Sequence, residues 1–216
     1  MNLVFLELPF LLRGAYYTLL ITMVSMIFGL IIGLLVAIAR LTGKRLLVSL
    51  AKMYVSIIRG TPLLVQLFII YYGLPDLGIT FEPLTAAFIA LSINVGAFLS
   101  ETIRGSLLAI SKGQMEAAMC LGMTYWQAMR RIILPQATRV AIAPLGNTFI
   151  GMLKETSLVS IITVTEILRA SQLLIAKHLV VMPFYIAIAI MYWLMSTVFS
   201  FILGFIENKL SKGYSS

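Results

Sequence analysis

Long apolar runs separated by short polar segments extend along the whole chain. The uncharged runs cover residues 14–39, 60–75, 83–100, 140–153 and 178–206. A spanning helix needs about 20 mostly apolar residues, so the first and last runs qualify alone and the middle three need polar flanks or broken helices. The runs lack the alternation of barrel strands, and backbone groups in lipid must bond internally. The pattern predicts an all-α membrane protein with five transmembrane helices.

The composition supports the bilayer as the solvent of this chain. Its 216 residues are 61% hydrophobic and 11% charged, whereas soluble domains carry about 45–50% apolar and 25% charged residues. The net charge of +8 does not indicate nucleic acid, because the basic residues cluster at the ends of apolar runs. Cys120 and His178 are the only residues of their types, so neither a disulfide nor a metal site is expected.

The distribution of lysine and arginine predicts the orientation. Eleven basic residues lie in alternate connections that share one side of the membrane: Arg40, Lys44, Arg45, Lys52, Arg104, Lys112, Arg130, Arg131, Arg139, Lys209 and Lys212. The other side receives three, which are Arg13, Arg169 and Lys177. Since the basic side faces the cytoplasm, the amino terminus is expected outside and the carboxyl terminus inside. No linker or internal repeat divides the chain, so residues 1–216 are expected to form a single domain.

The cytoplasmic connection of about residues 105–138 predicts a helix–turn–helix. Ser111 and Gln114 have the spacing of a capping box, in which the serine closes the first turn and the glutamine bonds back. Gly122 suits the left-handed position that follows a helix. The first helix is therefore expected to begin after Ser111 and to stop at Gly122.

A second helix is expected in the same connection. Thr124 and Gln127 form another capping box. Proline has no N–H and disfavours helix at the residue before it, so this helix is expected to run to Leu134 and to break before Pro135.

The first of these helices has two interpretations. It could lie on the membrane surface without a partner. Alternatively it is a docking helix, because Ala117 and Ala118 permit close approach and Glu116 can accept charge-assisted hydrogen bonds. The residues alone leave both interpretations open.

These residues also resemble a known family. Glu116-Ala117-Ala118, then Gly122, then Ile133-Leu134-Pro135 resemble the "EAA" loop of permease subunits of ABC importers. Other strings resemble the polar amino-acid uptake branch, nearest to permeases for cystine and other polar amino acids: residues 59–63, 92–94, 111–114 and 153–158. The resemblance extends over nearly the whole chain, in the same order and with five spans.

The resemblance implies a transport subunit of a bacterial cytoplasmic (inner) membrane, driven by a separate ATPase. The residues implied to contact that ATPase are Glu116, Ala117, Ala118, Gly122, Leu134 and Pro135. The chain has no G-x-x-x-x-G-K-[ST] phosphate loop, so ATP and Mg²⁺ are expected on the partner and no cofactor in this chain. A second permease subunit and an extracytoplasmic amino-acid-binding protein are further implied partners.

Polar residues within apolar spans are candidates for the substrate pathway. They are Asn94, Glu101, Lys154, Glu155, Thr156 and Ser157. Thr156 and Ser157 could donate to a substrate carboxylate, and Asn94 and Glu155 could accept from its ammonium group. Lys154 and Glu155 point about 100° apart on a helix, and they fit gating or interhelical ion pairs with other groups equally well. Glu101 is three residues before Arg104, a spacing that pairs charges on one helix face.

Residues 59–62, Arg59-Gly60-Thr61-Pro62, are expected to interrupt a helix. Glycine breaks it, threonine caps the next helix and proline fits the first helical position. The interruption is either a hinge near the inner mouth or the start of the second span.

Three other functions remain as alternatives. A secondary amino-acid transporter or channel is disfavoured because the chain has no inverted repeat. An intramembrane enzyme is disfavoured because no catalytic motif is present. A purely structural anchor does not explain the polar residues inside the spans.

Overall fold

The computed structural model describes residues 2–211, which form helices with no strand among them. After the short α1 (Asn2–Leu6), three helices are long and apolar enough to cross a membrane: α2 (Leu8–Leu41), α5 (Pro83–Leu108) and α10 (Met182–Ser211). Two bent helix pairs, Arg45–Gly60 with Leu63–Leu77 and Tyr125–Ile162 with Ile167–His178, complete five candidate spans. The prediction of an all-α membrane protein is therefore confirmed, and the predicted number of five spans is reached when each bent pair is counted as one span.

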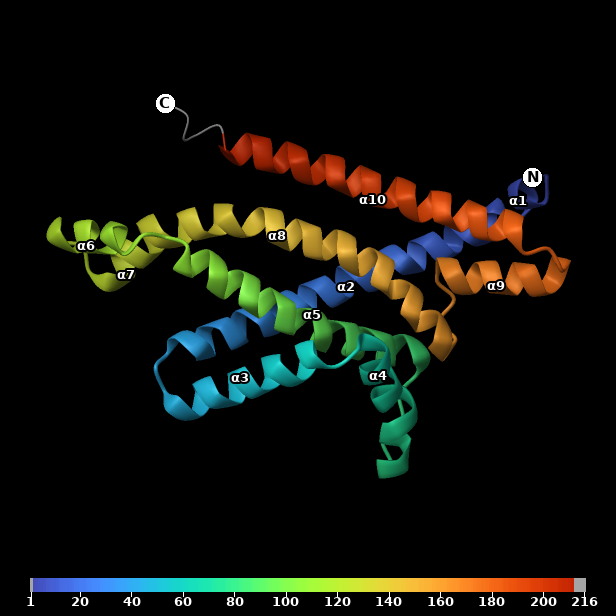
Figure 1. Ribbon diagram of the computed structural model, residues 1–216, viewed down its shortest axis with the longest axis horizontal. Coiled ribbons are helices and arrows are strands. Elements are labelled where there is room, and N and C mark those ends of the chain that lie inside the picture. Colours follow the sequence, from blue (N-terminus) through green and yellow to red (C-terminus); the bar gives the residue numbers. More distant parts are fainter. Residues whose placement is uncertain (1, 212–216) are drawn as a thin grey trace.

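The helices α2 and α5 cross in close contact at the centre of the molecule (Figure 1). A Cβ added at Gly29 would lie 2.2 Å from Cγ1 of Val95, and one at Gly33 would lie 2.9 Å from Cβ of Leu99. On the facing helix, a Cβ at Gly96 would meet Ile32 at 2.8 Å. Glycine at these positions lets the two backbones approach more closely than any side chain would allow.

The second span starts earlier than the apolar run indicated. Helix α3 (Arg45–Gly60) packs along α2 and α5, and it bends by 104° into α4 (Leu63–Phe68). The π-helical η1 (Ile69–Gly73) and the 3₁₀ turn η2 (Leu74–Leu77) prolong α4, which projects away from the other helices (Figure 1).

Lys52 therefore lies inside a helix and not in the connection before the span. Helix α3 keeps one face buried through Ala51 and Val55 while its other faces are exposed. The polar residues on those faces lower the local hydropathy, which is why the apolar run alone placed the start of the span at residue 60.

The predicted hairpin consists of α6 (Lys112–Cys120) and α7 (Tyr125–Ala128). It lies at the same end of the molecule as the turn between α2 and α3 and the last residues of α10 (Figure 1). The π-helical η3 (Met129–Ile133), α8 (Leu134–Glu155) and the 3₁₀ turn η4 (Thr156–Ile162) carry the chain from the hairpin to the opposite end. Lys212, used in the charge distribution, lies outside the described residues.

An ion-pair cluster joins three elements at that opposite end. Glu7, just before α2, accepts hydrogen bonds from Nζ of Lys177 at 2.6 Å and shares one of 2.8 Å with Nε2 of His178. Both partners end helix α9 (Ile167–His178), and the His178 ring stacks on Phe184 of α10. The hydrogen bond from Lys177, with a smaller contribution from His178, holds the pKa of Glu7 below its ordinary value.

We predict that Gly33→Ala destabilises the protein by about 1–3 kcal/mol, because the added methyl group must displace atoms of α5. Gly105→Ala is the matched control, since nothing lies within 4 Å of a Cβ at that position. Thermal unfolding in detergent should show a lower midpoint for Gly33→Ala alone. Equal midpoints for both variants would contradict the close approach of α2 and α5.

The Glu7 cluster predicts a pH dependence of stability. A carboxyl group whose pKa is lower when folded stabilises the protein above its ordinary value of 4.5, and this contribution is lost as the pH falls below that value. Thermal midpoints of the natural protein and of Glu7→Gln, measured from about pH 3 to 7, should therefore differ near neutrality and converge at the acid end. A difference that stays constant over the whole range would exclude this ionisation as its cause.

Candidate functional site

Helix α6 begins after Ser111 as predicted, but Gln114 makes a different hydrogen bond from the one expected. Oγ of Ser111 accepts a hydrogen bond from the backbone N–H of Gly113 at 3.3 Å. The return bond from Gln114 that a capping box requires is absent, so that part of the prediction is wrong. Oε1 of Gln114 instead accepts from Nε2 of Gln136 at 3.5 Å, which ties α6 to α8.

One side of α6 is exposed and the other is buried. Glu116 and Ala117 are exposed, whereas Ala118 is buried against the rest of the hairpin. Gly122 has a φ of +80°, which confirms the predicted left-handed end of the helix. Large exposed apolar side chains surround this end of α6 and α7: Met119, Leu121, Tyr125 and Trp126. Apolar side chains are exposed along the spans as well, so this exposure alone does not distinguish the hairpin.

Helix α7 is capped as predicted, but it does not stop before Pro135. The backbone N–H of Thr124 donates to Oε1 of Gln127 at 2.9 Å, and the N–H of Gln127 donates to Oγ1 of Thr124 at 3.4 Å. The chain then stays helical from Tyr125 to Glu155, so the predicted break is wrong. Proline removes one hydrogen bond and crowds the carbonyl four residues earlier. The π turn of residues 129–133 contains one extra residue at this place and accommodates the proline within the helix.

A buried amide cluster lies at the bend between α3 and α4. Nε2 of Gln66 lies 2.8 Å from the carbonyl of Ile58, 2.8 Å from Oγ1 of Thr61 and 3.1 Å from its carbonyl. Oε1 of Gln66 accepts from Nδ2 of Asn94 on α5 at 3.0 Å. Gln66 thus donates hydrogen bonds to backbone carbonyl groups that have no helical partner at the break. A glutamine within an apolar run was the available signal for this role, and sequence reasoning missed it.

The interruption at residues 59–62 is confirmed, with different roles for its members. Oγ1 of Thr61 donates to the carbonyl of Ile57 at 2.9 Å, so the threonine closes α3 and does not cap α4. Pro62 occupies the position before the first residue of α4. The Arg59 guanidinium lies over the ring of Phe98, 5.2 Å from its centroid.

Glu101 is paired on two sides. Nη2 of Arg104 donates to its Oε2 at 2.7 Å, which is the predicted pair on one helix face. Arg40 at the end of α2 donates to its Oε1, a partner that sequence reasoning missed because 61 residues separate the two. Both carboxylate oxygens are thus occupied within the chain, and they hold α2 against α5.

The remaining pathway candidates gather at the end of α8. Lys154 and Glu155 are exposed there, while Thr156 is buried and Ser157 is half-buried. The hydroxyls of Thr156 and Ser157 donate at 2.8 Å to the carbonyls three residues earlier, where α8 tightens into η4. No hydrogen bond within residues 2–211 joins Asn94 to this group.

A second buried polar cluster, also missed, connects α9 to α10. The fully buried carboxylate of Glu166 accepts from the backbone N–H of Leu168 at 2.9 Å and of Arg169 at 2.8 Å. The hydroxyl of Tyr192 on α10 donates to the same carboxylate at 2.6 Å. Three donors satisfy this charge, which gives Glu166 a structural role as the N-cap of α9.

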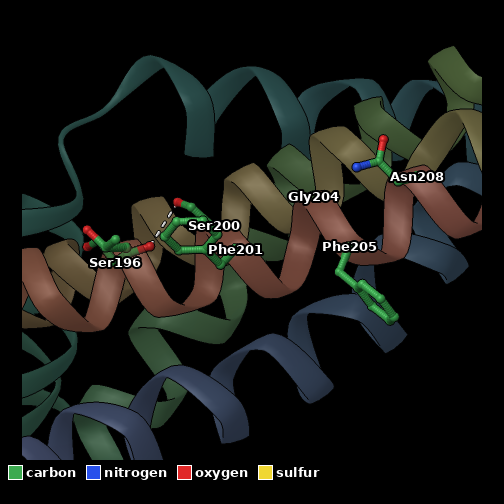
Figure 2. A pocket seen from close by; sticks show the side chains of 7 residues that line it. Ser196, Ser200, Phe201, Gly204, Phe205 and Asn208 are labelled. Atoms are coloured by element: carbon green, nitrogen blue, oxygen red, sulfur yellow. Dashed lines mark hydrogen bonds between the residues drawn. The ribbon is translucent and has the colours of Figure 1, made fainter.

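A surface cavity along α10 contains none of the predicted site residues. Its volume is about 570 Å³, and all of its lining residues belong to that one helix: Ser196, Thr197, Ser200, Phe201, Gly204, Phe205 and Asn208. Figure 2 shows the hydrogen bond along the helix from Oγ of Ser200 to the carbonyl of Ser196. The cavity is thus a groove on the outside of the bundle.

Five candidate spans with an exposed, capped helical hairpin at one end are the architecture of a polytopic membrane protein. The chain belongs to the family described as binding-protein-dependent transport system inner membrane components, whose sequence profile matches residues 8–212. It is an integral membrane protein of that family.

Named relatives agree with this assignment. The chain is 47% identical to the L-cystine transport system permease protein TcyB of Bacillus subtilis, over 94% of this chain and 88% of TcyB. It is 40% identical to the glutamine transport system permease protein GlnP of Escherichia coli, over 94% of each chain. A crystal structure of an amino acid ABC transporter with histidines matches with a TM-score of 0.91 and 37% identity, covering 94% of this chain and 95% of that one. The MetNI methionine ABC transporter, at 22% identity and a TM-score of 0.79, shares the fold.

We predict that Gln66→Leu destabilises the protein by about 1–3 kcal/mol, because carbonyl groups at the bend and the amide of Asn94 lose a buried partner. Asn94→Leu added to this variant should then have a smaller effect than Asn94→Leu alone, since the bond between the two amides is already gone. Thermal unfolding of the four proteins in detergent measures both effects. Fully additive losses would show that the two amides are not coupled.

Proposed function

We propose that this chain is the permease subunit of an ABC importer for polar amino acids, cystine among them. The cystine, glutamine and unspecified amino-acid transport systems of its relatives support this substrate class. ATP and Mg²⁺ bind a separate ATPase subunit, and the chain itself carries no cofactor. Residues 1–216 act as a single permease domain.

The observation that carries the proposal is the continuous helix from the hairpin to the candidate pathway. Helix α6 is closed at both ends and contacts α8 through Gln114 and Gln136 at 3.5 Å, and in this proposal the two helices move together. From Tyr125 the chain remains helical to Glu155. A displacement of the hairpin is therefore transmitted along the helix to Lys154 and Glu155 at the other end.

The coupling contact in this proposal is the exposed side of α6. Glu116 and Ala117 enter a groove of the ATPase, Ala118 and Gly122 hold the shape of the hairpin, and Leu134 and Pro135 mark its junction with the span. The π turn beside Pro135 lies between the contact and the membrane, a place where a local change of helix register can occur.

The substrate contacts in this proposal lie at the end of α8. A zwitterionic amino acid needs partners of both signs, and Lys154 and Glu155 offer both on adjacent exposed positions. The hydroxyl of Ser157 is half-buried in the same region and can accept from an ammonium group, but not donate to a carboxylate, while it donates to the backbone. Thr156 is fully buried and supports this turn through its own bond to the backbone. Asn94 acts through Gln66 at the hinge of residues 59–62, and Glu101 keeps α2 and α5 together on the inner side.

The orientation follows from charge and arrangement together. The basic connections, the hairpin and the end of α10 share one end of the molecule (Figure 1), which we assign to the cytoplasm of a bacterium. The amino terminus then lies outside. A binding protein docks at the outer end, and a second permease subunit completes the pathway, because five helices make only part of a channel wall.

The decisive variant for this proposal is Glu116→Lys. In proteoliposomes that contain the chain, its ATPase and its binding protein, one class of amino acids should stimulate ATP hydrolysis. With a coupling free energy of about 1–3 kcal/mol, losing the contact lowers this stimulation by about 5- to 150-fold.

Lys44→Glu is the control, because Lys44 is exposed in the turn before α3, at the same end of the molecule as the hairpin but outside it. This variant should keep the stimulation. Hydrolysis that ignores every amino acid and both substitutions would refute the proposed coupling.

A further inference from the structure

Helix α3 has three distinct faces. One is buried and includes Ala51 and Val55. The second is apolar and exposed, formed by Leu46, Leu50, Met53 and Ile57. The third, here called the basic face, is polar and exposed and consists of Arg45, Ser49, Lys52, Ser56 and Arg59.

The three cations of the basic face lie almost in line along the helix. They are spaced seven residues apart, which is close to two full turns. With a rise of about 1.5 Å per residue, Lys52 lies about 10 Å and Arg59 about 21 Å along the axis from Arg45. Arg45 follows the turn at the hairpin end of the molecule, so the row of charges runs from that end to the bend at Gln66 (Figure 1).

No ion pair in the described part of the protein involves Arg45, Lys52 or Arg59. Arg59 contacts the face of the Phe98 ring, which satisfies its charge only in part. Charged side chains in spanning helices face lipid at a high free-energy cost and normally line water or meet an opposite charge. Arg45 lies at the end of the helix, where its side chain can reach headgroups, whereas Arg59 lies about 21 Å further along the axis, beside the bend.

We infer that the basic face of α3 lines the water-filled pathway and forms successive binding positions for the carboxylate of the transported amino acid. This inference rests on the proposed function. The positions lead from the bend at Gln66 to the hairpin end of the helix, which is the direction of import. An amino acid on this route has its carboxylate towards α3 and its ammonium group away from it, because the cations repel the latter.

Accessibility of single cysteines tests the aqueous location. In a Cys120→Ser background, Ser49→Cys and Ser56→Cys sample the basic face, while Leu50→Cys and Ile57→Cys sample the exposed apolar face one residue further on. The assembled transporter in proteoliposomes is treated on both sides with a sulfonate-bearing methanethiosulfonate. The basic-face cysteines should react about a hundredfold faster, since the charged reagent enters water and not lipid. Ser56→Cys reacting as slowly as Ile57→Cys would overturn the inference and show a face covered by lipid or by a second copy of the chain.

Uptake of a labelled polar amino acid tests the role of the charge. Lys52→Gln should lower the initial rate about tenfold, because an attractive charge in a confined pathway raises the local concentration of its ligand. Lys52→Arg should restore it, and an equal loss in both variants would overturn the carboxylate positions. Labelling does not require transport, so the two hypotheses can fail separately. If the basic-face cysteines react but the protein without substitutions imports no amino acid, the proposed function is refuted and the aqueous location of the basic face still holds.

Discussion

The close approach of α2 and α5 is the constraint on which the other contacts depend. Lipid offers no hydrophobic driving force between helices, so association comes from tight packing and hydrogen bonds. Gly29 and Gly33 on one helix and Gly96 on the other remove the side chains that would hold the backbones apart. Arg40 and Glu101 pair across the same two helices further along. Helices α3 and α8 then pack against this central pair, each against α5.

The position of α8 links this core to the ends of the molecule. Gly146 gives room to Leu203 of α10, and the rings of Phe149 and Phe199 lie 4.8 Å apart, so α8 lies between α5 and the last span. The same helix continues through the π turn into the hairpin at one end and reaches Glu155 at the other. A partner that moves the hairpin therefore acts on a helix packed against both central and outer spans.

Local chemistry was readable from the sequence, whereas effects of tertiary structure were not. Gly122 and the Thr124 box obey rules of helix ends, which depend on neighbouring residues alone. The π turn before Pro135 was not predicted, because proline is expected to end a helix and no residue composition indicates a π turn. Gln66 and Arg40 have partners that are distant in sequence, and no periodicity reveals such pairs. Helix α3 was missed as part of a span because its basic residues match those of a cytoplasmic connection.

In our proposal this permease moves amino acids with energy that another subunit supplies through the hairpin. The most direct measurement is accumulation of labelled cystine or glutamine in proteoliposomes that contain ATP inside, with the binding protein outside, in the presence and absence of the ATPase. We expect accumulation against a gradient only when both ATP and the ATPase are present. Accumulation driven by an ion gradient in vesicles that lack the ATPase would contradict it and identify a secondary transporter.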